Sequence, residues 1–261
     1  MITSTENPKV KLARSLLERR GRVEAGQCLA EGVRLIEDAM RVGVVPTLVF
    51  FVASAADSPR AVALLDAARS AGALVWELSR AVFGALSDTN TSQGIIAVLP
   101  IPHPSFPPNP DLILVLDQVR DPGNLGTILR SAEAAGANPL LLTKGCTDPW
   151  NPKVLRAGMG AHFRLSLIVD QGWDEIARIV DTRPLWLADA HAAIPYDRVD
   201  WTHPSALVIG GETSGISDEA ARIGAGRIAI PMAGRAESLN AAMAATAILF
   251  EAARQRRRVP N

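Results

Sequence analysis

The chain has few of the side chains that build disulfide frameworks and metal sites. Its two cysteines, Cys28 and Cys146, show no CxxC spacing. This excludes a disulfide-rich scaffold and is typical of a reducing compartment, so we expect a cytoplasmic protein. The four histidines are scattered along the sequence and form no metal-ligand pair, and we therefore expect no metal site.

Net charge and long apolar segments are also lacking. The 27 basic and 27 acidic residues give a formal net charge of +0, so any contact with nucleic acid must come from local basic patches. The most apolar predicted helix, 239–250, is too short to cross a bilayer. The polar segment 1–8 lacks the apolar core of a secretory signal. The sequence thus predicts a protein without a membrane partner.

Proline is concentrated in one stretch, residues 99–110. Dense proline removes backbone donors and favours an extended chain, so neither a helix nor a central strand can persist there. The length of 261 residues is enough for two ordinary domains. We therefore expect a domain at 1–100, a linker at 101–110 and a second domain at 111–261.

Both predicted domains alternate strands with helices, which is the pattern of an α/β fold. In the first we expect helices at 8–22, 58–71 and 80–86, and a further helix that follows residues 28–34 and ends at residue 39. The expected strands are 47–52, 73–78 and 94–99. In the second we expect strands at 112–119, 140–143, 165–169, 185–188, 206–210 and 227–230, and helices at 125–135, 152–158, 173–180, 218–223 and 239–251. Several strands of the second domain are continuous apolar runs, which predicts parallel strands covered on both faces.

Three segments of the second domain place polar residues at strand-to-helix turns: 116–132, 208–216 and 230–240. In the last of these, a strand is followed by a glycine-containing loop, and Ser238 and Asn240 stand where a helix should begin. Ser238 is a good N-cap, and the N–H groups of the helix behind it can hold a ligand. A plain strand-loop-helix unit without a ligand accounts for one such segment equally well.

Taken in order, the three segments resemble the three motifs of the SpoU (TrmH-type) branch of the SPOUT RNA methyltransferases. The resemblance implies an α/β fold with a trefoil-knotted, mostly parallel sheet and flanking helices. It also implies transfer of a methyl group from S-adenosylmethionine to a ribose 2′-hydroxyl of RNA. Residues 1–100 resemble the smaller L30e-like α/β domain that binds substrate in many of these enzymes, through residues 2–4, 7–11 and 31–34.

The matching positions imply the residues of the site. The catalytic set is Asn124, Arg130, Glu212, Ser238 and Asn240. Arg130 corresponds to the arginine assigned as the base in this family. A guanidinium stays protonated at neutral pH, so Arg130 can instead grip a phosphate or stabilise negative charge on the 2′-oxygen. Glu212 is expected to orient Arg130 or the ribose. The cofactor contacts, chiefly through backbone groups, fall at Gly210, Gly211, Ile230, Met232, Gly234 and Leu239.

Two groups of basic residues are candidates for contacts with RNA. They are Lys9, Lys11 and Arg14 in the first domain, and Lys153 and Arg156 in the second. A solvated helix face accounts for Lys153 and Arg156 equally well. The resemblance further implies 23S rRNA as the substrate and a homodimer formed through the second domain.

Two alternatives stand beside the 23S rRNA enzyme. One is a resistance-type enzyme that methylates rRNA to block an antibiotic, and the sequence does not separate the two. The other is a catalytically silent RNA-binding scaffold of the same fold, against which the complete catalytic set argues. A nucleotide-dependent oxidoreductase would need GxGxxG after a first strand, which the segment 123–126 does not supply.

Overall fold

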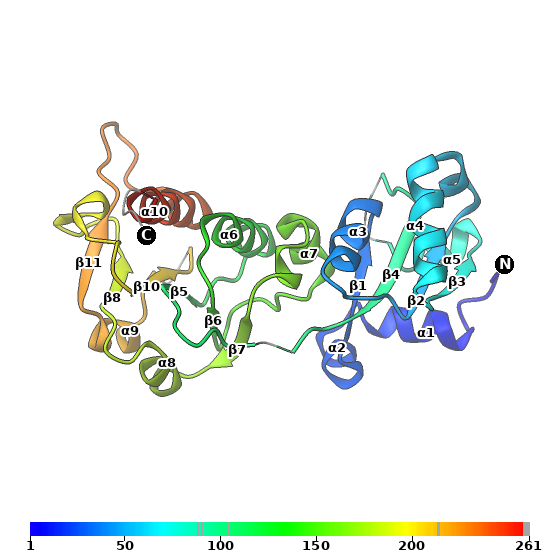
Figure 1. Ribbon diagram of the computed structural model, residues 1–261, viewed down its shortest axis with the longest axis horizontal. Helices are drawn as coiled ribbons and strands as arrows, with labels where there is room; N and C mark the ends of the chain where they lie inside the picture. Colours follow the sequence, from blue (N-terminus) through cyan, green and yellow to red (C-terminus); the bar gives the residue numbers. More distant parts are fainter. Residues whose placement is uncertain (88, 90, 104, 213–214, 258–261) are drawn as a thin grey trace. The chain divides into compact units, whose positions relative to one another are not determined.

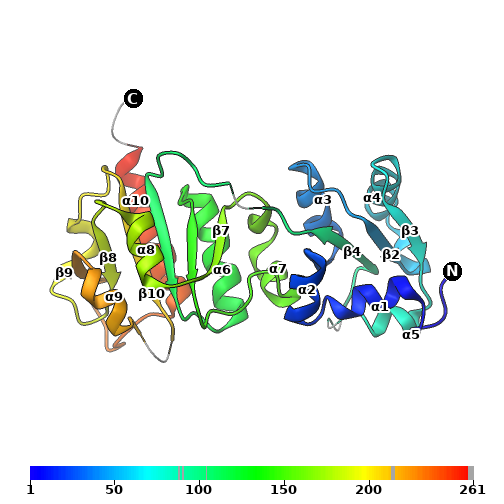
Figure 2. The same cartoon turned by 90° about the horizontal axis from the view of Figure 1, so that it is seen from below.

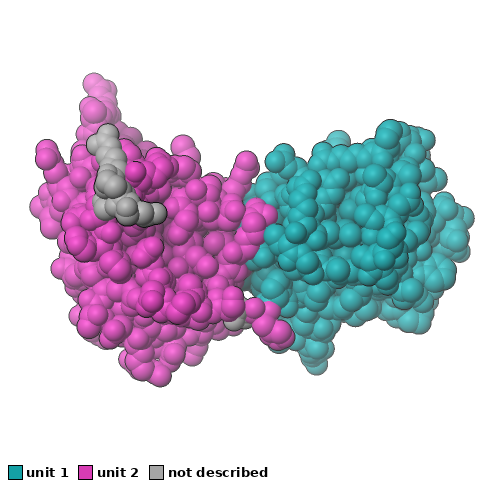
Figure 3. Space-filling view, in the orientation of Figure 1, with its two compact units in different colours: residues 1–102, 148–163 teal, residues 103–147, 164–261 magenta. Residues whose placement is uncertain are grey.

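The computed structural model describes residues 1–87, 89, 91–103, 105–212 and 215–257 of the protein. The chain forms two compact units, coloured separately in Figure 3. The first consists of residues 1–102 and 148–163, and the second of residues 103–147 and 164–261.

The first unit is a sheet with helices on both faces (Figure 1). Its strands are β1 (Gln27–Glu31), β2 (Leu48–Phe51), β3 (Leu74–Glu77) and β4 (Ile95–Pro100), and its helices are α1 (Pro8–Ser15), α2 (Arg19–Ala25), α3 (Val33–Arg41), α4 (Pro59–Ser70), α5 (Arg80–Gly84) and α7 (Pro152–Gly158). The strand order is β1-β4-β2-β3, with β4 antiparallel to both of its neighbours and β3 parallel to β2. The helices α1 and α5 cover one face, where Val10 and Val82 join Phe50 in the core.

The second unit is a parallel sheet. Its strands are β5 (Leu112–Asp117), β6 (Leu140–Thr143), β7 (Leu167–Gln171), β8 (Leu185–Ala188), β9 (Ile194–Pro195), β10 (Ser205–Gly210) and β11 (Gly226–Ala229). They lie in the order β7-β6-β5-β10-β8-β11-β9, and every pairing is parallel, as the apolar runs predicted. All residues of β5 are buried, which a strand covered on both faces requires.

Helices cover both faces of this second sheet. They are α6 (Pro122–Ala135), α8 (Trp173–Val180), α9 (Asp218–Ile223) and α10 (Ala241–Arg256). Figures 1 and 2 show α6 and α10 side by side on one face, and α8 and α9 on the other. The pair α6–α10 is joined by a hydrogen bond of 2.7 Å between the hydroxyls of Ser131 and Thr246. The α/β class is thus confirmed, whereas the knot stays a prediction.

Residues 148–163 belong to the first unit, although their position in the sequence had placed them in the expected domain 111–261. The helix α7 packs against β1. Arg22 contacts Oδ2 of Asp148 through Nε at 2.7 Å and Nη2 at 2.6 Å. Both side chains are largely buried, so this ion pair ties the segment to the first unit. The other boundary, between residues 102 and 103, lies inside the expected linker 101–110.

The helix expected at 8–22 is interrupted after Ser15. The buried Arg22 side chain explains the break, because its Nη1 donates to the carbonyls of Leu16 and Leu17 at 2.7 and 2.8 Å. In a continuous helix these carbonyls would accept from backbone N–H groups one turn later. Gly21 lies against the Ser15 carbonyl so closely that a Cβ there would be 2.1 Å from the oxygen.

The last helix begins later than expected. Asn240 is the N-cap of α10, since its Oδ1 accepts from the N–H groups of Ala242 and Met243 at 2.9 and 3.3 Å. The predicted cap, Ser238, lies in the loop before it. None of the described helices is long and apolar enough to cross a membrane.

Candidate functional site

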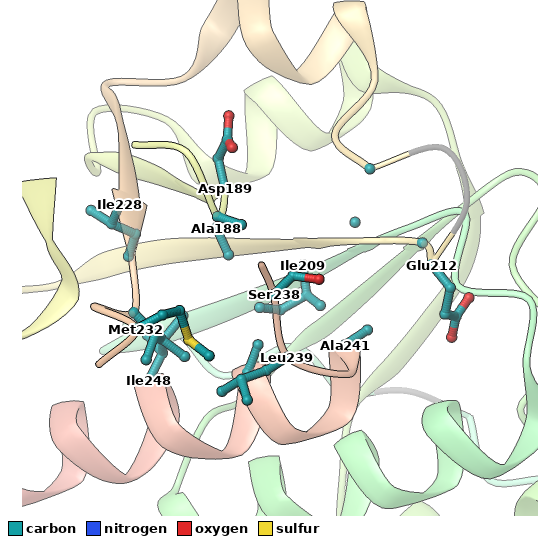
Figure 4. A pocket seen from close by; sticks show the side chains of 16 residues that line it. Ala188, Asp189, Ile209, Glu212, Ile228, Met232, Ser238, Leu239, Ala241 and Ile248 are labelled. Carbon is teal, nitrogen blue, oxygen red and sulfur yellow. The ribbon is translucent and has the colours of Figure 1, made fainter. Parts of the chain in front are cut away.

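A cavity opens at the carboxyl ends of the central strands of the second unit (Figure 4). In parallel sheets this edge is where ligands commonly bind. The loops that follow β8, β10 and β11 converge here with the start of α10. The lining residues are Ala188, Asp189, Ala190, Ile209, Gly210, Gly211, Glu212, Gly215, Ile228, Ile230, Met232, Ser238, Leu239, Ala241, Ala244 and Ile248.

Five of the six positions expected to contact the cofactor line this cavity: Gly210, Gly211, Ile230, Met232 and Leu239. The sixth, Gly234, is not among the lining residues. Within the second motif, Thr213 and Ser214 lie outside the described residues.

Close approach of two backbone segments explains the glycine at position 210. A Cβ on Gly210 would lie 2.3 Å from the carbonyl oxygen of Gly215, so a side chain would push the loop open. The loop is also held from β5, because Gly211 N–H donates to the Asp117 carbonyl at 2.8 Å. The buried Asp117 carboxylate accepts from the Ser217 N–H at 2.8 Å. The first two motifs are therefore fixed to one another by the end of β5.

A chain of side-chain hydrogen bonds joins the three motifs at the cavity rim. Asn124 Nδ2 donates to Oε1 of Glu212, and Asn240 Nδ2 donates to Oδ1 of Asn124 at 2.9 Å. Asn240, at one end of this chain, also caps α10, and the backbone N–H of Asn124, its middle member, donates to the Asp121 carboxylate at 2.8 Å. Each amide is thereby fixed in orientation, and the Glu212 carboxylate is held at the cavity.

The remaining two residues of the expected catalytic set are placed differently. Ser238 lines the cavity and is exposed. Glu212 and Ser238 thus line the cavity, and Asn124 and Asn240 are joined to Glu212 by hydrogen bonds. Arg130 is exposed on α6 and does not line the cavity.

Asp189, which is not among the residues expected from the sequence, follows β8 directly and lines the cavity. Its Oδ1 accepts the His191 N–H at 2.9 Å, and its Oδ2 contacts Nη1 of Arg227 at 2.5 Å. The His191 N–H, and then the Arg227 guanidinium, hold the pKa of Asp189 below its ordinary value, so the side chain is a carboxylate at neutral pH. An acidic residue directly after an apolar strand was the available signal.

The lining fits S-adenosylmethionine. Isoleucine, leucine and methionine side chains offer apolar contacts to an adenine ring, while the glycine loops bring backbone polar groups within reach. Asp189, Glu212 and Ser238 supply polar partners for hydroxyl and amino groups. No group of three histidine, cysteine or acidic side chains in the described part of the chain could hold a metal ion.

The cysteines do not supply a nucleophile. Cys28 is fully buried, and burial raises the pKa of its thiol to about 12. Burial also raises the pKa of Cys146. A reactive cysteine needs a lowered pKa, so the site carries no sign of covalent thiol chemistry.

The basic candidates of the first unit have different surroundings. Lys9 Nζ lies 5.0 Å from the ring centre of Trp76, and Lys11 Nζ is 2.6 Å from Glu6. Arg14 and Lys153 are exposed, and Arg156 is half-buried. All five of the expected RNA contacts lie in the first unit, because 148–163 belongs to it.

Comparison with known families gives two matches that together span most of the chain. Residues 111–250 match the SpoU rRNA Methylase family, and residues 7–97 match the MRM3-like substrate binding domain. The first match covers more than half of the chain and contains all three motifs.

Curated proteins and solved structures agree with this. The chain is 35% identical to "rRNA methyltransferase 3, mitochondrial" of Homo sapiens, over 90% of this chain and 69% of that protein. It is 30% identical to the 23S rRNA (guanosine(2553)-2′-O)-methyltransferase RlmP of Bacillus subtilis, over 95% and 97% of the two chains. The SpoU methyltransferase AviRb from Streptomyces viridochromogenes, solved with AdoMet, superposes with a TM-score of 0.88 at 31% identity, covering 97% of this chain and 99% of that one. This chain therefore belongs to the SpoU rRNA methylase family.

Proposed function

We propose that this protein transfers a methyl group from S-adenosylmethionine to a ribose 2′-hydroxyl of ribosomal RNA. The observation that carries the proposal is the hydrogen-bonded chain of Glu212, Asn124 and Asn240 at the rim of the cavity. Each of the three residues comes from a different family motif, and a catalytically silent scaffold would not need them joined.

The methyl donor supplies an activated sulfonium, so the protein has to position the partners and stabilise charge. Gly210, Gly211, Ile230, Met232 and Leu239 would hold the cofactor in the cavity. The 2′-hydroxyl must lose its proton, which passes to water, as the methyl arrives and the demethylated cofactor is released. We assign Glu212 and Ser238 to orienting the ribose, because both lie at the cavity and Glu212 is held there by Asn124.

In this proposal Arg130 acts at the cavity of a second copy of the chain. Its side chain is exposed on α6 rather than in the cavity, and the neighbouring α10 exposes apolar Met243 and Phe250. We propose a homodimer that packs through the α6–α10 surface and brings Arg130 to the partner's cavity. There its guanidinium stabilises negative charge on the 2′-oxygen, which a permanently protonated group can do.

The 23S rRNA is our proposed substrate, since the Bacillus subtilis relative is named for it. A resistance-type rRNA methyltransferase stays an alternative, because it would carry out the same chemistry. Gly234, although outside the cavity lining, stays a proposed cofactor contact through its loop. The cytoplasm is proposed from the two free cysteines.

Transfer of labelled methyl from S-adenosylmethionine to 23S rRNA by the purified protein tests the proposal. Arg130→Ala should lower turnover by about 10²–10³-fold, the usual effect of losing a positioned electrostatic group. Arg130→Lys should fail as well, because lysine lacks the planar fork. Cofactor affinity, measured by calorimetry, should stay near that of the wild type in both variants.

One result would count against the proposed reaction, and another only against the role of Arg130. Absence of cofactor binding by the wild-type protein would remove the methyl donor. Near-normal turnover by Arg130→Ala would remove Arg130 from the mechanism and leave the reaction standing.

A further inference from the structure

The edge strand of the first unit exposes an aromatic side chain. Trp76 and Leu74 on β3 are 39% and 54% exposed, whereas their partners on β2, Phe50 and Leu48, are 0% and 6% exposed. Paired residues of neighbouring strands lie on the same face of a sheet. This is the face that α1 covers, because Val10 packs in the same core as Phe50. The apolar face therefore continues past α1 to an exposed rim at β3.

Cations lie beside this rim. The Lys9 ammonium is 5.0 Å from the ring centre of Trp76, within the range of a cation–π contact. Lys11, on the same helix, has a side chain that is 57% exposed and pairs with Glu6 at the surface. Exposed ion pairs of this kind contribute little, so a phosphate can readily replace the Glu6 carboxylate.

We propose that Trp76 and Lys9 form a stacking platform for an unpaired base of the RNA substrate. The indole ring stacks on the base, and Lys9 and Lys11 contact the flanking phosphates. This inference rests on the proposed function and on the match of residues 7–97 to a substrate binding domain. It adds an aromatic contact to a surface for which the sequence had suggested only charges.

The chemistry of the rim favours RNA as its occupant. Every base has a flat face, so aromatic stacking tolerates different sequences, and proteins read RNA chiefly at unstacked bases in loops. A protein partner that covered Trp76 and Leu74 would have to desolvate the Lys9 ammonium beside them. A polyanion instead gains from that charge.

Binding of a fluorescein-labelled single-stranded oligoadenylate to the full-length protein, followed by anisotropy over a series of salt concentrations, tests the platform. Trp76→Ala should weaken binding by about 5- to 100-fold without changing the salt dependence, because stacking releases no counterions. Lys9→Gln should lower the slope of log affinity against log salt by about 0.7. Trp76→Phe should retain most of the affinity, since it keeps an aromatic face.

Leu74→Ala is the matched control, because it removes an exposed apolar side chain from the same strand without removing an aromatic ring. It should bind like the wild type. A duplex RNA of equal length should respond to Lys9→Gln and not to Trp76→Ala. Circular dichroism and thermal melting show whether each variant is folded.

Three results would overturn the inference. Unchanged affinity of Trp76→Ala for the single strand removes the stacking. An equal loss in Leu74→Ala indicates general apolar docking. A reduced salt slope in Trp76→Ala means that the ring only positions Lys9. In each of these the wild type still binds RNA and the proposed function stands, whereas a wild type that binds no RNA would overturn the RNA substrate itself.

Discussion

Asn240 has two roles at the residue scale, and they can be separated by substitution. Its Oδ1 caps α10, and its Nδ2 donates to Asn124. Asn240→Asp keeps the capping oxygen and loses the donor. We expect a melting temperature near that of the wild type and turnover lowered by roughly 3- to 10-fold, which is what one neutral hydrogen bond is worth. Asn240→Ala loses both and should also lose about 1 kcal/mol of stability.

The comparison of these two variants decides between the roles. Wild-type turnover in Asn240→Asp would mean that the side chain only caps the helix. Thermal melting and the methyl-transfer assay, run on the same preparations, supply both quantities.

Asp189 is expected to recognise hydroxyl groups of the cofactor rather than its positive charge. The carboxylate is already paired with Arg227, so the pair has no net charge, and hydroxyl donors are the better partners for its remaining acceptor positions. The two ribose hydroxyls are present in both S-adenosylmethionine and its demethylated product. Asp189→Asn should therefore lower the affinity for both ligands by the same factor, roughly tenfold.

Calorimetry with the two ligands checks this, with Asp174→Asn, an exposed acid on α8, as the control. If Asp189 instead recognised the sulfonium, Asp189→Asn would lower the affinity for S-adenosylmethionine much more than the affinity for the product. That outcome would contradict the expectation.

At the scale of elements, the exposed side of α10 predicts the dimer surface. Met243 and Phe250 are 62% and 42% exposed on a helix that otherwise packs on α6 and the sheet. Met243→Glu would place a charge in an apolar interface without a partner, so we expect the dimer dissociation constant to rise at least about tenfold. Val169→Glu, which changes an exposed apolar side chain on β7, should leave association unchanged.

Light scattering over a range of micromolar concentrations measures the association. A wild type that is monomeric and active would refute the dimer. A Met243→Glu variant that associates normally would place the interface elsewhere.

Local signals predicted several helices of both units closely. The helices expected at 152–158, 173–180 and 218–223 have those bounds in the structure. Their starts carry local signals, such as the capping side chains of Asn151 and Ser217. The break between α1 and α2 could not be predicted this way, because it depends on where the Arg22 guanidinium finds its partners.

The motif residues show the same difference between what local sequence predicts and what tertiary contacts decide. Sequence placed Glu212, Asn124 and Asn240 in one site through the family resemblance, but the order of their hydrogen bonds follows from side-chain geometry. The sequence did not indicate Asp189, because this residue follows β8 and none of the three motifs includes that strand.

On the scale of the whole molecule, the Arg22–Asp148 pair makes the first unit depend on a segment far away in the sequence. The side chains are 3% and 13% exposed. Asp148→Asn would leave the Arg22 guanidinium buried without its counter-charge, and the expected loss is about 3–5 kcal/mol of stability. Asp66→Asn, which breaks an exposed pair with Arg69, should change stability little.

Denaturant unfolding of the full-length variants provides the measurement. Equal stability of Asp148→Asn and Asp66→Asn would show that residues 148–163 do not support the first unit energetically. Residues 148–163 would then be better assigned to the expected domain 111–261 than to the first unit.

Mass spectrometry shows directly whether the methyl group reaches a ribose 2′-oxygen of rRNA. The nucleosides are released from unmethylated 23S rRNA after incubation with the protein and S-adenosylmethionine. We predict one 2′-O-methylnucleoside, absent when Arg130→Ala replaces the wild type. A methyl group on a base, or no transfer to RNA by a protein that binds the cofactor, would contradict the account.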